Sequence, residues 1–479
     1  MSHFLRFTAI VFSIAMSATP LLAAPVKGTV TEFKSPSGLV EQCIRITPFP
    51  GAHYSKSDHR QEAAYCELDV YQLALCPKLW STSPGTILYQ IDASDYGEDF
   101  AQFEQQHCRS GHHAKSAAVH HPATFKNSVN DRKTSATYAP SSWVYYHLSR
   151  YFDTGVRVPV AVYRSMDAAQ HHQRVVKPAL ALTSGHRNLK MLAAGWQFLD
   201  GVESGTASTT AQAAVLTDSK QQVFGVLLDN KGDRYGPEVN GTRESGWGVG
   251  QNLDFQQTAP FLALRSELPV EEAAKQAIHD ARSNPHMAAK LPAVTPPVQV
   301  VFWMQDVLEI TLLDYLLGQQ DRIGNIDYNW RWYWIEDGKL ESKAAHGKEV
   351  PEKLKPFKPV RLRQSAINDN DAGVRAGYAN FAKKAGMLDG LRHYHPGLYQ
   401  RLGQLAADLE SKGPAYQWMV NDAGLSTREA DAITSRATEA LGILRKDCAS
   451  GRLKLDLDPA RYLGAEPFTG DIACDTPGP

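Results

Sequence analysis

The chain has 479 residues, of which 43% are hydrophobic and 21% are charged, as is ordinary for a globular protein. Its formal net charge is −1, and it contains no long run of like charges, so no overall field draws it to nucleic acid or to an anionic membrane. This composition argues against nucleic-acid binding as its main task. The length suffices for two or three core-forming units.

The first 23 residues have the pattern of a secretory signal peptide. Arg6 precedes the apolar stretch 7–18, and Pro20 comes shortly before the small residues Ala23 and Ala24. The stretch is shorter than the roughly 20 apolar residues of a membrane-spanning helix. We therefore predict cleavage after Ala23, export to the periplasm or to the outside, and no membrane span.

Cysteines support an exported protein. The six are Cys43, Cys66, Cys76, Cys108, Cys448 and Cys474. An even number in an exported chain indicates disulfide bonds, and Cys448–Cys474 is the favoured pair because these two lie together near the C-terminus. Cys43–Cys66 and Cys76–Cys108 are one choice among the possible pairings of the other four. Zinc binding is the rival interpretation, but no C-x-x-C spacing supports it.

Residues 25–115 contain short apolar runs, such as 87–91, that predict strands. A histidine-rich stretch follows, made of His107, His112, His113, His120 and His121. Imidazole binds several first-row metals, so a metal-binding exported protein is one hypothesis. We favour an exposed, mobile loop, because neither acidic partners nor a regular helical spacing accompanies these histidines.

Residues 141–152 predict a helix, and residues 158–163 predict a strand after it. Further along, we expect a strand pair around residues 213–217 and 223–228. The glycine-rich segment 240–250 has no clear helix start behind it, so we expect a structured connector rather than a nucleotide-binding loop. Residues 283–297 are rich in Pro and Ala and predict a linker.

Long helices are expected from residue 298 onward. Residues 298–317 are apolar around most of a helix, but Asp306, Glu309 and Asp314 interrupt them. Three carboxylates favour a buried helix over a membrane span. Near the C-terminus, Ser426 with Glu429 predicts a capping box at a helix start.

The most informative segment follows that buried helix. The helix is expected to end at Gly318, and a polar loop with Asp321, Arg322 and Asn325 comes next. A tryptophan-rich strand and an Asp-Gly hairpin turn at residues 337–338 are predicted after it.

A second polar loop, residues 368–373, contains Asp369, Asp371 and Gly373. Phosphoryl transfer needs a carboxylate at the acceptor hydroxyl, and an Asn and a second Asp to hold magnesium on the phosphates. Turn formation alone is the alternative, since Asp, Asn and Gly dominate turns. Two such loops in this order behind a buried helix favour the phosphoryl-transfer hypothesis.

These loops resemble the catalytic and metal-binding loops of atypical kinases, the group of secretory-pathway kinases, phosphatidylinositol 4-kinases and HipA-type toxin kinases. The helix at 146–152, followed by Val158-Pro159-Val160, resembles theirs as well. The resemblance covers residues 120–165 and 298–375. It implies an α+β, two-lobed, protein-kinase-like fold with a mixed strand and helix N-terminal lobe and a mainly helical C-terminal lobe.

The corresponding domain organisation places the N-terminal lobe, with its disulfide-bearing extension, at residues 24–190. The strand pair, connector and linker take residues 191–297, and the helical lobe takes residues 298–479.

The resemblance also implies roles for single residues. Asp321 matches the catalytic Asp, and Asn325 matches a metal-binding Asn. Asp371 matches the metal-binding Asp of the second loop, with Asp369 as a close rival. Lys126 lies where a strand lysine would pair with the phosphates of ATP or another nucleotide. The cofactors implied are Mg²⁺ and that nucleotide, and the acceptor is an unknown protein, lipid or sugar.

Two departures from the family pattern leave a second hypothesis open. Ser142 stands where these families place the Glu that pairs with the strand lysine, and Asn325 lies four residues after Asp321, where several relatives use five. Either the ion pair comes from elsewhere or the site is degenerate. A pseudokinase-like binding or scaffold protein is therefore the alternative.

Overall fold

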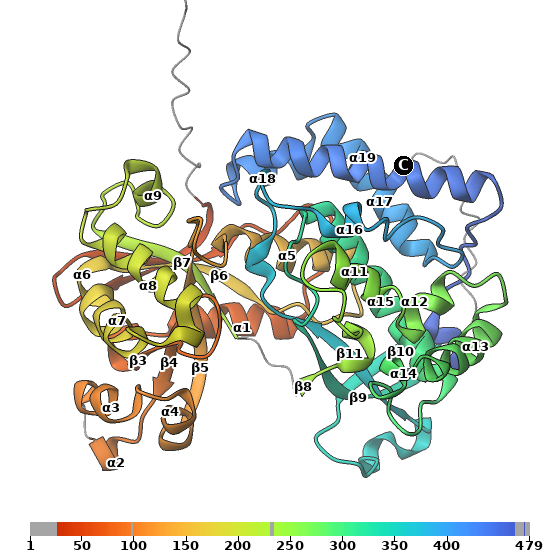
Figure 1. Ribbon diagram of the computed structural model, residues 1–479, viewed down its shortest axis with the longest axis horizontal. Coiled ribbons are helices and arrows are strands. Elements are labelled where there is room, and N and C mark those ends of the chain that lie inside the picture. The colour runs from red at the N-terminus through yellow and green to blue at the C-terminus, as the bar shows by residue number, and fades with distance from the viewer. Residues whose placement is uncertain (1–25, 97–98, 230–233, 465–473, 475–479) are drawn as a thin grey trace, which may run out of the picture.

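The computed structural model describes residues 26–96, 99–229, 234–464 and 474 of the chain. Within them the protein is α+β, with two β-sheets (Figure 1). The larger sheet lies in the red-to-yellow half, and the smaller sheet lies in the green-to-blue half beside most of the long helices. The predicted signal peptide, residues 1–23, lies outside the described residues.

The larger sheet has seven antiparallel strands in the order β1-β2-β6-β7-β5-β4-β3. Its strands are β1 (Gly28–Lys34), β2 (Val40–Ile46), β3 (Ala74–Pro77), β4 (Thr86–Gln90), β5 (His120–Asn127), β6 (Ala161–Asp167) and β7 (Gln222–Leu228). The middle strand, β7, comes from residues 191–297, which the predicted domain organisation placed outside the N-terminal lobe. The sheet therefore joins segments almost 200 residues apart, as strands 28–34 and 222–228 show.

Of the strand pair expected in this region, the strand at 223–228 is confirmed as β7, whereas the strand at 213–217 is wrong. Residues 213–217 form no strand: α9 (Thr209–Ala213) precedes them, and only the isolated bridge between Leu216 and Val223 links them to β7. The physical reason is local, because Ser208 accepts a hydrogen bond from the N–H of Ala211 and so starts a helix in an alanine-rich run. Strand β7 pairs with β5 and β6 instead.

Helices cover this sheet. They are α1 (Lys56–Glu67), α2 (Ala93–Tyr96), α3 (Phe100–His107), α4 (Gly111–Ala117), α5 (Ala139–Phe152), α6 (Ala168–His171), α7 (Lys177–Thr183), α8 (Lys190–Glu203) and α9. The predicted helix at 141–152 is confirmed as α5, whereas the predicted strand at 158–163 begins only at Ala161. The histidine-rich stretch is not a loop, since most of it belongs to α3, α4 and β5.

The other half is built around α15 (Pro297–Leu317), which confirms the predicted buried helix. It packs against α12, α13 and α19, and Leu312, Leu313 and Leu316 are fully buried. The helices of this half are α10 (Pro237–Asn240), α11 (Val249–Phe255), α12 (Ala259–Leu264), α13 (Val270–Ser283), α14 (Pro285–Ala288), α15, α16 (Phe381–Lys384), α17 (Pro396–Glu410), α18 (Pro414–Asn421) and α19 (Thr427–Ala449).

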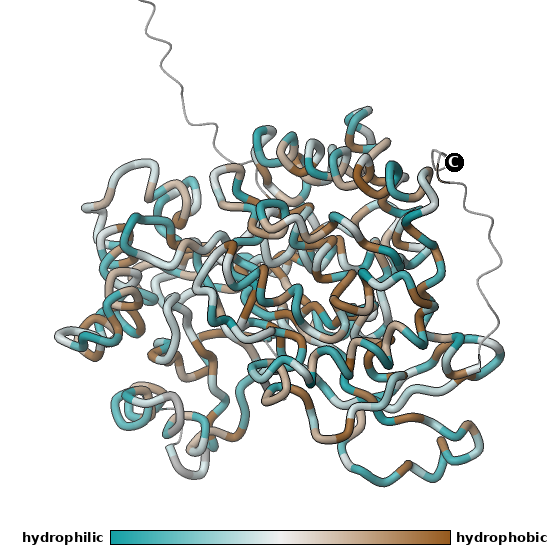
Figure 2. Tube along the Cα trace, turned by 45° about the vertical axis from the view of Figure 1, so that its right-hand side comes forward, coloured by the Kyte–Doolittle hydropathy of each residue, from teal (hydrophilic) through white to brown (hydrophobic). Residues whose placement is uncertain are grey.

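Hydropathy follows this arrangement. Figure 2 shows brown, hydrophobic residues along chain segments in the middle of the molecule, whereas the outer helices alternate between brown and teal. Such alternation is expected of a helix that buries one face. The capping box that starts α19 at Ser426 and Glu429 is confirmed. Within the described ranges, no helix is both long and apolar enough to cross a membrane.

The smaller sheet has the strand order β10-β9-β11, with β8 also paired to β9. Its strands are β8 (Arg234–Tyr235), β9 (Ile326–Glu336), β10 (Lys339–Ala344) and β11 (Val360–Ile367). The predicted hairpin turn is confirmed: Asp337 and Gly338, between β9 and β10, have φ values of 50° and 74°. Ile326 at the start of β9 pairs with Ile367 at the end of β11. The two polar loops therefore meet at one end of this sheet.

All three disulfide bonds follow the predicted pairing, namely Cys43–Cys66, Cys76–Cys108 and Cys448–Cys474. The rival zinc interpretation is wrong, because these bonds use all six cysteines. Disulfide bonds of this kind are typical of exported proteins.

The buried carboxyl groups of α15 make stability depend on pH. Burial raises the pKa of Asp306 to about 7, and burial together with the Asp306 charge raises the pKa of Glu309 to about 8. Both groups bind protons more tightly in the folded state, since unfolded carboxyl groups titrate near pH 4. The folded state is therefore favoured at low pH, and this contribution is lost as the pH rises through about 7 to 8.

We expect the free energy of unfolding to fall by up to about 1.4 kcal/mol per pH unit for each such group between about pH 5 and pH 8. Urea unfolding at several pH values measures the slope. Glu309→Gln should flatten it, whereas Glu352→Gln, at a side chain that is 84% exposed, should not. An unchanged slope in Glu309→Gln would contradict the assignment.

Candidate active site

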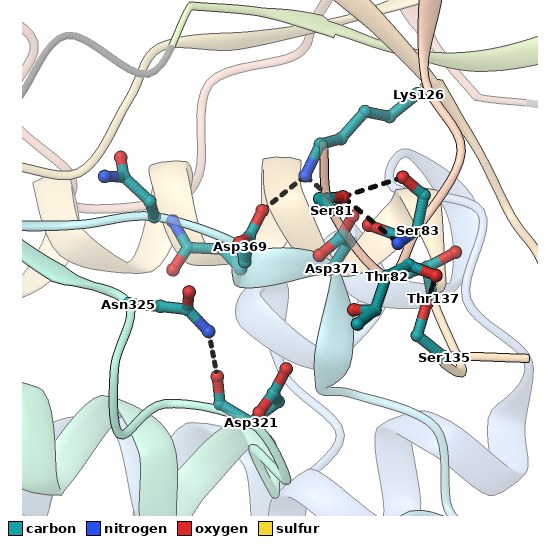
Figure 3. A network of polar contacts seen from close by, with 12 residues as sticks. Ser81, Thr82, Ser83, Lys126, Ser135, Thr137, Asp321, Asn325, Asp369 and Asp371 are labelled. Atoms are coloured by element: carbon teal, nitrogen blue, oxygen red, sulfur yellow. Dashed lines mark hydrogen bonds and ion pairs between the residues drawn. The ribbon is translucent and has the colours of Figure 1, made fainter. Parts of the chain in front are cut away.

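Lys126, near the end of β5, joins the larger sheet to the second polar loop. Its Nζ donates to Asp369 Oδ1 at 2.6 Å and to Asp371 Oδ2 at 3.1 Å (Figure 3). Only 2% of Lys126 is exposed. Burial lowers the pKa of Lys126, but the two aspartates outweigh it and raise the pKa above its ordinary value. The lysine is thus a buried cation held by two anions.

The first polar loop begins where α15 ends at Gly318, whose φ of 63° is in the left-handed region. Gln319 Oε1 accepts the N–H groups of Gln320 and Asp321, each at 3.0 Å, and so fixes the turn. Asn325 Nδ2 donates to the backbone oxygen of Asp321 at 2.7 Å (Figure 3). Because its amide nitrogen is used in this way, Asn325 has its amide oxygen to offer to a cation.

The second polar loop is held against the N-terminal end of α5. Asp369 has a left-handed φ of 48°, and a short 3₁₀ turn, Asn370–Ala372, follows it. The backbone oxygen of Asp371 accepts the N–H of Tyr138 at 2.6 Å, and Ser141 Oγ donates to the oxygen of Asn370 at 2.5 Å. These bonds fix the direction of the buried Asp371 side chain.

Arg322 connects both loops to α15. Its guanidinium pairs with Asp314 at 3.0 Å and donates to the backbone oxygen of Asn368 at 2.6 Å. It also donates to Asn370 Oδ1 at 2.7 Å. Arg322 thus holds both loops in shape, because a planar guanidinium can serve several acceptors at once.

Asp321 lies beside the aspartates of the second loop. Burial, together with the charges of Asp369 and Asp371, raises the pKa of Asp321. One carboxylate oxygen accepts a hydrogen bond from Trp247 Nε1 at 3.4 Å. Asp321 is only partly buried, so an acceptor can reach it. A carboxyl group with a raised pKa that an acceptor can reach is a suitable general base.

Trp247 belongs to the glycine-rich segment that the sequence analysis treated as a connector. Its indole is 65% exposed and packs edge-on against Phe381, with ring centroids 4.9 Å apart. The expectation that no helix starts behind this segment is wrong, because α11 begins at Val249, directly after Gly248. No side-chain cap marks that start, and Gly248 has a φ of 83°, so the usual sequence signal is missing.

The ion pair of Lys126 does come from elsewhere. Ser142 is buried in α5, and its hydroxyl has no hydrogen-bond partner among the described residues. The ion partners that the structure shows for Lys126 are Asp369 and Asp371. Lys126 thus has acidic partners without a glutamate from α5, and both aspartates share this one lysine.

A magnesium ion bound with a nucleotide would find suitable donors here. Asp371, Asp369 and the amide oxygen of Asn325 are the hard oxygen ligands that Mg²⁺ prefers, and such sites commonly use one or two carboxylates plus phosphates. In the part of the chain that the structure describes, no three His, Cys, Asp or Glu side chains are arranged to hold a metal ion by themselves. Within the histidine-rich stretch, His107 bonds to Tyr96 and His121 to Thr124.

The structure therefore brings together the residues that the sequence analysis selected. Lys126, Asp369 and Asp371 are in direct contact, and Asp321 and Asn325 lie across from them (Figure 3). Comparison with models of known protein families gave no match, and a search among curated proteins found no similar sequence. The roles of these residues consequently rest on their own geometry and chemistry.

Proposed function

We propose that this protein is an exported, periplasmic or secreted, kinase-like phosphotransferase that uses a magnesium nucleotide. The observation that carries the proposal is the ion pairing of Lys126, from the seven-stranded sheet, with the second polar loop, which meets the first at one end of the β9–β11 pair. These segments are far apart in the chain, and local turn formation does not require them to converge. The family resemblance of the loops supports the same activity.

In this proposal Asp321 orients the acceptor hydroxyl and takes its proton. The acceptor oxygen forms a bond to the terminal phosphorus, while the bond from that phosphorus to the bridging oxygen of the nucleotide breaks. Lys126 pairs with phosphate oxygens and so stabilises the charge that moves to the leaving group. Asp371, with Asp369 or Asn325, would hold Mg²⁺, which supplies further charge neutralisation at the phosphates.

Nucleotide binding must then compete with the resting ion pairs. Lys126 now satisfies both aspartates, and the Lys126 charge lowers the pKa of Asp369 against the effect of burial. A phosphate chain offers the ammonium new anionic partners, and the aspartates then become available to a cation. This exchange predicts that metal and nucleotide bind together rather than separately.

The same ion pairs favour a second candidate, a pseudokinase-like binding or scaffold protein. If Lys126 stays with Asp369 and Asp371, no metal binds and no transfer follows. Binding experiments separate the two candidates, because only the enzyme needs both ligands at the site.

We expect Mg²⁺ and ATP together to raise the melting temperature, since a ligand at 100 times its Kd stabilises the native state by about 2.7 kcal/mol. Asp371→Asn should remove most of the magnesium-dependent part of the shift. Asp337→Asn, at an exposed hairpin position, is the matched control and should behave like wild type. Thermal unfolding with and without each ligand measures the effect. A wild type that shows no shift with any magnesium nucleotide would exclude the enzyme and leave the scaffold.

A further inference from the structure

A second lysine lies across the sheet from Lys126. Phe125, Thr86 and Pro77 are paired in register on β5, β4 and β3. In this register, the next residues along the three segments are Lys126, Gly85 and Lys78. The N–H of Lys78 donates to the oxygen of Gly85 at 2.8 Å. Residues directly opposite one another in a sheet project from the same face, so both lysines rise from one side.

Gly85 places no side chain between the two lysines, and a Cβ there would make only ordinary contacts, with Phe125 O and Thr124 Cγ2 each at 3.6 Å. A Cβ at this position would come within 3.7 Å of Lys126 Cγ, on the face that carries the lysine side chains. Since neighbouring strands lie about 4.8 Å apart, the backbones of Lys78 and Lys126 are separated by about 10 Å. Together they border a strip that no side chain of the middle position fills.

Lys78 is half-buried, and nearby carboxylates balance its charge less closely than they balance the charge of Lys126. Asp369 and Asp371 form their close ion pairs with Lys126. Burial and then the Lys126 ammonium lower the pKa of Lys78, and the two aspartates oppose this lowering. Two cations on one face repel each other, so a polyanion between them would be favoured.

The hairpin loop after Lys78 adds hydroxyl groups beside this strip. Ser81 Oγ donates to the oxygen of Ser83 at 2.9 Å, and Ser135 Oγ donates to the oxygen of Thr82 at 2.9 Å. Figure 3 shows these side chains next to Lys126 and Asp371. The loop is thus folded and tied to a neighbouring segment, with hydrogen-bonding groups close to the two lysines.

We propose that Lys78 is a second phosphate-binding residue, and that the strip over Gly85, between Lys78 and Lys126, holds a chain of three phosphoryl groups. This inference rests on the proposed function and specifies its ligand. One lysine suffices for a single phosphate, whereas two lysines about 10 Å apart suit an extended triphosphate. The triphosphate comes either from a nucleotide or from inorganic triphosphate.

The test compares the affinities of the full mature chain for Mg·ATP, Mg·ADP, AMP and inorganic triphosphate by titration calorimetry. Lys78→Met should weaken Mg·ATP binding by about 10- to 100-fold, the usual effect of losing a charged hydrogen bond, and should leave AMP unchanged. Lys78→Arg should retain most of the affinity. Lys339→Met, at an exposed lysine of the other sheet, is the matched control.

Gly85 gives an independent measurement that removes no charge. Gly85→Leu should fill the strip and weaken triphosphate binding, whereas Gly85→Ala makes only ordinary contacts and should bind nearly as well as wild type. Far-ultraviolet circular dichroism checks that each variant is folded. If Lys78→Met does not fold, Lys78→Arg and the Gly85 pair decide the result.

The outcomes separate this inference from the proposed function. If wild type binds Mg·ATP and Lys78→Met binds it equally well, the second phosphate-binding residue is wrong while the phosphotransferase stands. If wild type binds none of the four ligands, both are overturned. Loss of inorganic triphosphate binding by the same factor as Mg·ATP would support the phosphate chain alone as the ligand. If Lys78→Met weakens the binding of Mg·ATP but not that of inorganic triphosphate, the ligand of the strip is a nucleotide.

Discussion

Asp321→Asn should lower the rate of phosphoryl transfer by about 10²- to 10⁴-fold, the usual cost of losing a general base. Asn has nearly the same shape and can still accept the hydrogen bond from Trp247, so the fold should survive. Binding of the magnesium nucleotide should change little, because the Asp321 side chain is not among the proposed metal ligands, and the bond from Asn325 goes to the backbone oxygen of residue 321. Transfer of phosphate from labelled ATP, together with nucleotide affinity, measures both effects.

The pH profile gives a second check on Asp321. Burial and two neighbouring aspartates raise the pKa of this carboxyl group, and a base acts only when it is deprotonated. In wild type, kcat/KM should therefore fall on the acid side, with an apparent pKa above the ordinary aspartate value of about 3.9. Asp337→Asn is the control, since Asp337 is exposed in a hairpin turn. Transfer by Asp321→Asn at the wild-type rate would show that another group is the base.

Arg322→Met should lower the free energy of unfolding by about 3–5 kcal/mol, the range expected when one partner of a buried ion pair is removed. Arg322 and Asp314 are each 3% exposed. Burial raises the pKa of Asp314, and Arg322 is the charge that opposes this shift. The variant also leaves the backbone oxygen of Asn368 without the guanidinium donor that holds the second loop.

A double variant distinguishes the unpaired charge from simple loss of packing. Asp314→Asn with Arg322→Met should be more stable than Arg322→Met alone, because no buried carboxylate is then left without its cation. Urea unfolding of wild type, both single variants and the double variant gives the coupling energy. A loss below about 0.5 kcal/mol in Arg322→Met would place this residue with surface substitutions and contradict its clamping role.

Several elements were predictable because their signals are local. Residues 298–317 form a long apolar run of helical length, and Gly318 ends it in a left-handed conformation that glycine adopts readily. The Asp-Gly pair at 337–338 predicts a hairpin turn, and the Ser426–Glu429 capping box predicts a helix start. Cys448–Cys474 was predictable because these two cysteines lie together near the C-terminus, whereas the pairing of the other four cysteines was one choice among several.

Other elements were not predictable, since tertiary contacts decided them. Residues 213–217 have β-forming residues, yet the helix α9 before them and the partners of β7 left them only one bridge. Helix α11 begins without a capping side chain, so the sequence gives no local signal for the start of this helix. The place of β7 in the middle of the larger sheet depends on its pairing with β5, for example of Thr124 with Leu228, which are far apart in the chain.

The candidate site divides along the same line. Polar residues directly after α15 and β11 are visible in the sequence. They pointed, together with the strand lysine, to Lys126, Asp321, Asn325, Asp369 and Asp371, whose roles stay predictions. Tertiary structure alone decided that Lys126 pairs with both aspartates, that Trp247 reaches Asp321, and that Lys78 stands across Gly85 from Lys126. The physical reason is that caps, turns and apolar periodicity act over a few residues. Strand register and ion pairing, in contrast, are selected by the free energy of the whole packed chain.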